Sequence, residues 1–239
     1  MCWPWGLQIH EIAETDVENY YPFLLNMTEI VFRDIETLKL PSREHGMSCL
    51  LMGSTRSGKT TLMNYLYENI FKNHITILHT GSAQAHIYKS YKDKVALAGE
   101  YMPELVSETY KINKRTDNHY EFLHILDDCV TVKNDVELKK LLTIYRNSRI
   151  SGMITGQSLT IFNNITRGNI NYVFLGYLNS DASVEQVIKS YLVSYFPSRM
   201  RLADKIKLYR EMTKDHHFII IDSINCEVFR TRLKHSQIV

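Results

Sequence analysis

The amino-acid sequence predicts an α/β fold in which a mainly parallel sheet carries helices on both faces and ends in a C-terminal β-hairpin. From residue 48 onward, short apolar, β-branched runs alternate with segments whose apolar residues recur at helical spacing. This repeated succession of strand, loop and helix is typical of parallel sheets that are buried on both faces. Near the C-terminus, two more strand-like runs flank a short polar turn and predict the hairpin.

The element boundaries follow from these runs. Strands are expected at residues 48–52, 75–78, 122–126, 152–155 and 172–175, and the hairpin strands at 218–221 and 228–233. Helices are expected at residues 60–71, 136–145, 182–195 and 200–212, and Pro103 is expected to begin another within the less clear stretch 84–116. Residues 1–46 lack this alternation. We therefore predict an N-terminal cover segment at residues 1–46 and a main domain at residues 47–239.

Composition is that of a globular protein. The 239 residues are 44% hydrophobic and 23% charged, so a sizeable core can be buried. A formal net charge of +2 neither demands nor excludes a nucleic acid partner. The four cysteines are far apart, which favours a reducing compartment. There is no signal peptide, and no apolar run approaches the ~18 residues that span a bilayer, so we expect an intracellular protein without a membrane segment.

A glycine-rich octapeptide, Gly53–Thr60, lies between the first strand and the next helix and fits the pattern G-x-x-x-x-G-K-[ST] in full. Its glycines let backbone N–H groups approach anionic oxygens, and the following helix N-terminus adds to this cradle. A chain of this length matches the pattern by chance roughly once in a hundred times. The sequence therefore predicts a phosphate-binding loop, or P-loop.

The positions of the P-loop have separate expected roles. Lys59 would neutralise the β- and γ-phosphates of a nucleotide, and Thr60 would offer its hydroxyl to Mg²⁺. Arg56 would either contact phosphate or face solvent. The expected nucleotide-binding residues are Gly53, Ser54, Thr55, Arg56, Ser57, Gly58, Lys59, Thr60 and Thr61.

An acidic group at a strand end is needed to hold Mg²⁺, and two segments offer one. Asp127 and Asp128 end the third strand, whereas Asp222 ends the first hairpin strand. We favour the first pair, because it lies within the α/β pattern and supplies one carboxylate for the metal and one for water. Asp127 is then the metal ligand, and Asp128 orients or deprotonates the attacking water. The alternatives are a cap or turn role for Asp128 and a turn role for Asp222.

Polar residues bracket the fourth strand. Gln157 follows it, which places this amide at the carboxyl edge of a parallel sheet, beside the P-loop, where it could bond the γ-phosphate and the attacking water. An ordinary loop glutamine is the alternative. Arg146, Arg149 and Arg167 lie on either side of the strand, and an arginine supplied across a subunit interface can stabilise transition-state charge.

Taken in order, these segments resemble the FtsK/HerA superfamily, and more narrowly the genome-packaging ATPases of poxviruses, other large DNA viruses, virophages and polinton-like elements. The resemblance covers about residues 48–175. It rests on the P-loop followed by Ile125-Leu126-Asp127-Asp128-Cys129, Tyr145-Arg146-Asn147-Ser148-Arg149, Gly156-Gln157-Ser158 and Ile165-Thr166-Arg167-Gly168-Asn169.

The resemblance implies a RecA/ASCE-like P-loop NTPase that uses ATP and Mg²⁺. It implies a homo-oligomeric ring, of roughly five or six subunits, that threads double-stranded DNA into a viral capsid. It also implies catalytic roles for Lys59, Asp128 and Gln157 and a trans-acting arginine, with Arg149 favoured over Arg167. Asp128 stands where many superfamily members have Glu. The implied location is the host cytoplasm or viral factory, with virion association an option.

Two other functions fit the sequence. A small-molecule P-loop kinase, acting on nucleosides or nucleotides, would use the same loop, and a non-hydrolysing assembly factor would bind ATP only to build an oligomer. Residues 189–214 are rich in Lys and Arg. Such a cluster could line a pore and contact DNA phosphates without reading bases, or simply form a solvated helix face.

Overall fold

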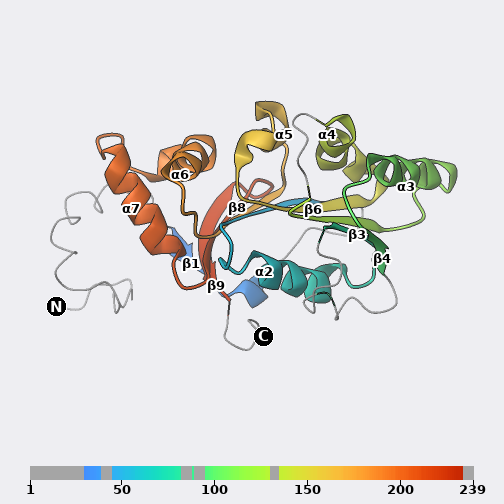
Figure 1. Cartoon of the computed structure of the whole chain (residues 1–239), viewed down its shortest axis with the longest axis horizontal. Coiled ribbons are helices and arrows are strands. Elements are labelled where there is room, and N and C mark those ends of the chain that lie inside the picture. The colour runs from blue at the N-terminus through green and yellow to red at the C-terminus, as the bar shows by residue number, and fades with distance from the viewer. Residues whose placement is uncertain (1–29, 39–44, 82–87, 89–94, 130–134, 234–239) are drawn as a thin grey trace.

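The computed structural model describes residues 30–38, 45–81, 88, 95–129 and 135–233. Within them, the chain forms a nine-stranded sheet with the order β1-β9-β8-β7-β2-β6-β5-β3-β4 (Figure 1). The strands are β1 (Val31–Phe32), β2 (Ser48–Met52), β3 (Ile75–Thr80), β4 (Val95–Ala98), β5 (Phe122–Asp127), β6 (Ile150–Gly156), β7 (Tyr172–Leu175), β8 (His217–Asp222) and β9 (Glu227–Arg232). All neighbours from β7 to β4 are parallel, and β8 and β9 form an antiparallel hairpin. Both the mainly parallel sheet and the closing hairpin are confirmed.

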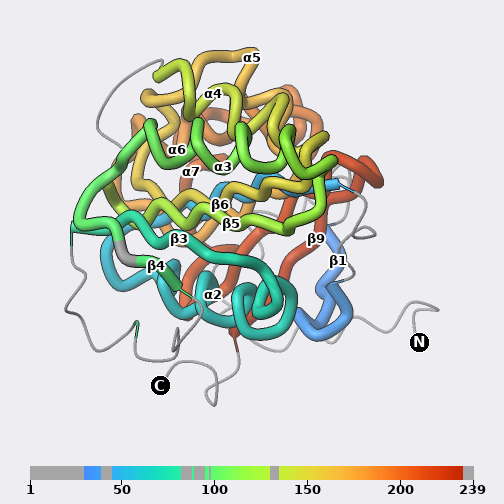
Figure 2. The backbone as a smooth tube through the Cα atoms, turned by 90° about the vertical axis from the view of Figure 1, so that its right-hand side faces the viewer, coloured from blue at the N-terminus to red at the C-terminus, as the bar shows by residue number. Residues whose placement is uncertain are grey.

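Helices cover both faces of the sheet, but unequally. The α-helices are α2 (Lys59–Leu66), α3 (Pro103–Arg115), α4 (Val136–Thr143), α5 (Asn164–Gly168), α6 (Asp181–Val187) and α7 (Leu202–Thr213). Figure 2 shows α2 on one side of the sheet and the helices from α3 to α7 on the other. Two parallel strands are joined by a crossover, which brings the chain back to the edge where the first strand began. Each crossover passes over one face of the sheet, so its helix covers that face.

Each face of the sheet has its own hydrophobic core, because alternate residues of a strand point to opposite faces. In β2, Leu50 and Met52 belong to the core under α3 to α7, whereas Cys49 and Leu51 belong to the core under α2. All residues of β2 are buried. A strand buried on both faces explains the continuous apolar run before the P-loop.

Two predicted long helices are interrupted. The predicted helix 60–71 is α2 followed by a π-helical segment, Tyr67–Phe71, and the predicted helix 182–195 is α6 followed by a π-helical segment and a 3₁₀ turn. The N-termini follow the usual capping rules: Ser180 accepts a hydrogen bond from the Ser183 N–H, and Pro103 begins α3.

The two edge strands were not predicted. β4 lies in the stretch that the sequence left unclear, and β1 lies within the predicted N-terminal cover segment. β1 pairs with β9, and Ile35, which follows it, is buried. Most of residues 1–46 lie outside the described residues, so a cover segment stays a prediction. Among the described residues, no helix is both long enough and apolar enough to cross a membrane.

A chain of buried hydrogen bonds joins β3 and β5 to α3. His79 Nδ1 lies 3.3 Å from both the Met102 N–H and the Glu100 carbonyl, and His79 Nε2 lies 3.0 Å from His124 Nδ1. His124 Nε2 then donates to Thr109 Oγ1 at 2.9 Å, and that hydroxyl donates to the Val106 carbonyl at 2.9 Å. Both imidazoles are fully buried.

Candidate nucleotide-binding and catalytic site

The order of the central strands brings the main site residues to one edge of the sheet. β2 lies between β7 and β6, and β5 follows β6, so the P-loop strand and the Asp127 strand are separated by one strand. These strands are parallel, so their carboxyl ends lie together. Gly53 follows β2, Asp127 ends β5 and Gln157 follows β6. Gly53, Asp127 and Gln157 thus lie at the same edge of the sheet, where ligands of parallel α/β sheets usually bind.

Lys59 lies inside its own loop. Its ammonium donates to the Gly53 carbonyl at 2.8 Å and to the Ser54 carbonyl at 3.2 Å. Burial lowers the pKa of Lys59, while the nearby carboxylates of Asp128 and Asp127 raise it. Both acidic side chains are therefore close enough to act on the ammonium. An ammonium held by loop carbonyls can exchange them for the stronger charge-assisted contacts that phosphate oxygens offer.

The interior of the loop fits an anion. A Cβ at Gly53 would lie 2.3 Å from Ser57 Oγ and 3.3 Å from Lys59 Cγ, so only glycine leaves this space open. Ser57 Oγ is buried and has no hydrogen-bond partner among the described residues. Gly58, in the left-handed region at φ 92°, sets the turn into α2. An unpartnered hydroxyl and a buried ammonium at a helix N-terminus suit a phosphate group.

The remaining positions of the loop are less enclosed. Thr55 and Arg56 are exposed, and Arg56 adopts a left-handed φ of 65°. Thr60 and Thr61 are half-buried in the first turn of α2. Arg56 therefore faces solvent, which is one of the two alternatives that the sequence left open.

Asp127 and Asp128 differ sharply in environment. Asp127 is buried, and each of its oxygens accepts a hydrogen bond, Oδ1 from Thr155 Oγ1 at 2.5 Å and Oδ2 from the Tyr88 hydroxyl. Asp128 is exposed, has a left-handed φ of 48°, and donates its N–H to Thr155 Oγ1 at 3.0 Å. A fixed buried carboxylate suits a metal ligand, and a free exposed one suits contact with water.

Asp222 has the turn role. Its Oδ1 accepts from the N–H groups of Ile224 and Asn225, at 2.9 and 3.0 Å. Because β8 is antiparallel to β7, Asp222 lies opposite Tyr172, the first residue of β7. It is therefore at the amino edge of the sheet, away from the P-loop.

The two arginines of interest lie in different places. Arg149 precedes β6, whose seven residues span about 23 Å, so it is at the opposite edge of the sheet from Gln157. Its guanidinium pairs with Glu121 and donates to the Asn118 and His119 carbonyls at 3.4 Å. The fold therefore keeps Arg149 from the P-loop of its own chain.

Arg167, by contrast, lies near the loop that follows β6. It donates from Nε to the Phe162 carbonyl at 3.1 Å and from Nη1 to Ser190 Oγ at 3.0 Å. It also lines a cavity of about 490 Å³ together with Ser158 and Thr160, which follow Gln157 directly. Gln157 itself is exposed.

A second layer of contacts supports the P-loop from outside. The Ser54 N–H donates to the Tyr177 carbonyl at 2.8 Å, and Ser54 Oγ accepts from the Asn179 N–H at 2.8 Å. Arg210 of α7 donates in turn to the Leu178 and Asn179 carbonyls, and Tyr209 donates to the Gly176 carbonyl at 2.7 Å. The loop after β7, residues 176–180, thus joins α7 to the P-loop.

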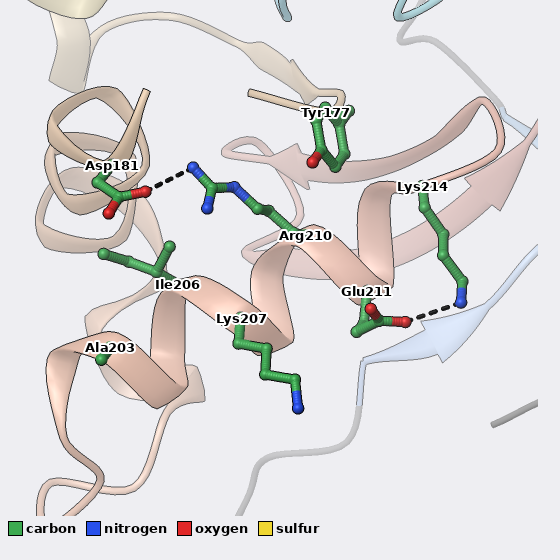
Figure 3. A pocket seen from close by; sticks show the side chains of 8 residues that line it. All are labelled: Tyr177, Asp181, Ala203, Ile206, Lys207, Arg210, Glu211 and Lys214. Carbon is green, nitrogen blue, oxygen red and sulfur yellow. Dashed lines mark hydrogen bonds and ion pairs between the residues drawn. The ribbon is translucent and has the colours of Figure 1, made fainter. Parts of the chain in front are cut away.

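Figure 3 shows the outer side of this junction, a cavity of about 400 Å³ beside α7. Arg210 points from α7 toward Asp181 at the start of α6, and Lys214 points toward Glu211. Lys189 and Arg201 are also paired, with Glu185 and Asp204. Four cations of the basic segment 189–214 therefore form ion pairs within the chain, and contact of this segment with DNA stays a prediction.

The sequence analysis did not identify the residues that hydrogen-bond to Asp127 or support the P-loop. Thr155 read only as part of a strand, and Tyr88 lay in the unclear stretch. Tyr209 and Arg210 were interpreted only as members of a helix in the basic segment. None of these four residues belongs to a recognisable sequence motif. Only Thr155, a polar residue near the end of a strand, carries a signal that could have suggested a role.

Fold and site together define a P-loop NTPase in which one strand separates the P-loop strand from the strand of the acidic pair. Comparison with known proteins agrees. The chain belongs to the Poxvirus A32 protein family, whose model matches residues 38–234. No curated protein sequence matches the chain.

Solved structures match at the level of the fold. B204, the DNA-packaging ATPase from Sulfolobus turreted icosahedral virus, is 12% identical with a TM-score of 0.56, covering 80% of this chain and 100% of its own. The genome-packaging NTPase B204 from Sulfolobus turreted icosahedral virus 2, in complex with AMPPCP, is 14% identical with a TM-score of 0.55, over 80% and 98%. The pCW3 conjugation coupling protein TcpA with ATPγS is 12% identical with a TM-score of 0.55, over 84% and 64%.

Proposed function

We propose that this protein is an ATP-driven motor that packages a viral double-stranded DNA genome into a capsid. The observation that carries the proposal is the assembly of Lys59, Asp127, Asp128 and Gln157 at one edge of a parallel sheet. The A32 family match and the fold shared with packaging NTPases support it. The nucleotide is ATP, and the metal is Mg²⁺.

Each side chain has a task in this scheme. The P-loop amides, Ser57 Oγ and the Lys59 ammonium bind the phosphates. Thr60 and Asp127 hold Mg²⁺, which when bound offsets the charge of the β- and γ-phosphates. Asp128 is exposed and close enough to Lys59 to raise its pKa, so it orients the attacking water and accepts its proton. Gln157 donates to the γ-phosphate and orients the same water.

The trans-acting arginine requires a second subunit. Arg149 lies at the edge of the sheet opposite its own P-loop, so it reaches a triphosphate only on a neighbouring chain. A head-to-tail ring, in which the nucleotide edge of one subunit meets another surface of the next, provides such a contact. We favour Arg149 as this residue, with Arg167 as the alternative.

The basic test is phosphate release from ATP by the purified full chain, with and without double-stranded DNA at low salt. We expect DNA to stimulate turnover and Lys59→Ala to abolish it, because removal of the ammonium leaves the phosphate charge unmatched. Lys72→Ala, an exposed lysine beyond the π-helical segment, is the matched control and retains activity. Turnover that ignores DNA, or phosphate transfer to a nucleoside, would refute the packaging function.

Mixed oligomers test the arginine. Lys59→Ala subunits lack a working P-loop but keep Arg149, and Arg149→Ala subunits have the reverse defect. If Arg149 acts in trans, mixing the two inactive variants restores part of the turnover, because some interfaces are then complete. No recovery with Arg149→Ala, but recovery with Arg167→Ala, would move the role to Arg167.

A further inference from the structure

The hydroxyl of Thr155 joins the two acidic residues of the site. Thr155 is the next-to-last residue of β6 and is 2% exposed. Its Oγ1 accepts from the Asp128 N–H at 3.0 Å and donates to Asp127 Oδ1 at 2.5 Å. The direction is unambiguous, because a backbone N–H can only donate and a hydroxyl has one hydrogen to give.

Asp127 is fixed from its other side as well. The Tyr88 hydroxyl donates to Asp127 Oδ2, and this ring is also buried. The two hydroxyls reach the carboxylate from different segments, β6 and the stretch between β3 and β4. An ionised carboxylate has about four acceptor positions, so two hydroxyls hold its orientation and leave positions for a cation.

Thr155 also bears on the other two polar residues of the site. Asp128 has a left-handed φ of 48°, which a residue with a Cβ seldom adopts, and its N–H is held by Thr155 Oγ1. Gln157 follows Thr155 by two positions, directly after the end of β6, so movement of β6 at Thr155 displaces Gln157 too. One side chain thus touches Asp127 and Asp128 and lies beside the residue that leads to Gln157.

We infer that Thr155 is a positioning residue: it turns the Asp127 carboxylate toward Mg²⁺ and sets Asp128 relative to it. The inference rests on the proposed function, since it assigns a support to the metal ligand of that same site. Residues that hydrogen-bond to a metal ligand, without touching the metal, usually change metal affinity by about 10–100-fold when removed.

The test is a titration of Mn²⁺ into the full chain bound to AMPPCP, followed by electron paramagnetic resonance. Thr155→Val keeps nearly the same shape and removes the hydroxyl, so we expect Mn²⁺ affinity to fall about 10–100-fold. Metal-free AMPPCP affinity, measured in EDTA, stays within about twofold, because the P-loop is unchanged. Thr155→Ser restores the hydroxyl and most of the Mn²⁺ affinity.

Thr231→Val is the matched control. Thr231 is a buried threonine of the same sheet whose hydroxyl has no hydrogen-bond partner, so its loss leaves Mn²⁺ affinity at the wild-type value. If Thr155→Val does not fold, Thr155→Ala, which also removes the hydroxyl, takes its place in the same titration.

The outcomes distinguish failure of the Thr155 positioning role from failure of the proposed function. Wild-type Mn²⁺ affinity in folded Thr155→Val or Thr155→Ala overturns the positioning role and leaves the proposed function intact. A wild-type protein that binds neither AMPPCP nor Mn²⁺ overturns both. An equal loss of Mn²⁺ affinity in Thr231→Val would also overturn the inference, since any buried threonine would then have the same effect.

Discussion

Lowering the pH should destabilise this protein through its buried histidines. Burial, with a contribution from neighbouring His79, lowers the pKa of His124 to about 3, whereas an unfolded histidine titrates near 6.5. Burial also lowers the pKa of His79. Below about pH 6.5, therefore, the unfolded chain binds protons that the folded chain does not bind, and the free energy of unfolding falls as the pH falls.

The magnitude follows from the shift. Each pH unit below about 6.5 costs about 1.4 kcal/mol per histidine that stays neutral in the fold, so His124 alone costs about 2 kcal/mol at pH 5. That is a sizeable part of the 5–15 kcal/mol typical of a folded domain. Between pH 7 and 8 this effect is absent, because His124 is neutral in both states.

Urea unfolding followed by circular dichroism at pH 7.5, 6.0 and 5.0 measures this dependence. His124→Asn removes the titrating group, and its free energy of unfolding should fall with pH less steeply than that of the wild type, by about 1.4 kcal/mol per unit. His119→Gln alters an exposed histidine and should keep the wild-type slope. Equal slopes for His124→Asn and the wild type would refute the reasoning.

Three further predictions concern the P-loop and its supports. Gly53→Ala should abolish ATP binding in a fluorescent-nucleotide titration, because the new Cβ would lie 2.3 Å from Ser57 Oγ; retained affinity would contradict the closed cradle. Arg210→Ala should weaken ATP binding about tenfold while the fold remains, because residues 176–180 lose two hydrogen bonds and Asp181 loses a third; an unchanged dissociation constant would show that this junction does not affect the P-loop. Thr231→Val should raise the free energy of unfolding by about 1 kcal/mol in urea titrations, because it removes a buried unpaired hydroxyl; a loss of stability would mean that the hydroxyl is paired after all.

The positions of the candidate phosphate- and metal-binding residues were predictable, because their signals are local or follow from sheet topology. The P-loop pattern is contiguous, and Asp127 and Gln157 each follow a strand, so a parallel sheet brings them together. The same reasoning places Arg149 at the far edge, because it comes before its strand. The interpretation of Asp222 as a turn residue is confirmed for a related reason, since its strand runs the other way.

The supporting contacts were not predictable, because they join segments that are distant in sequence. Tyr88 and Asp127 are 39 positions apart, and Ser54 and Asn179 are 125 apart. β1 has only two residues, too few for a periodicity to show. The continuation of α2 as a π-helical segment changes hydrogen-bond spacing without changing the apolar pattern, so the sequence predicted one helix.

The junction between α7 and the P-loop has a mechanical consequence. Arg210 and Tyr209 donate hydrogen bonds to carbonyls of residues 176–180. The same short loop is hydrogen-bonded to both the backbone N–H and the side-chain hydroxyl of Ser54. A displacement of α7 is thus transmitted to the P-loop through two sets of hydrogen bonds, one from α7 to residues 176–180 and one from these residues to Ser54. In the motor that we propose, this connection would couple displacement of α7 to the P-loop and displacement of the P-loop to α7.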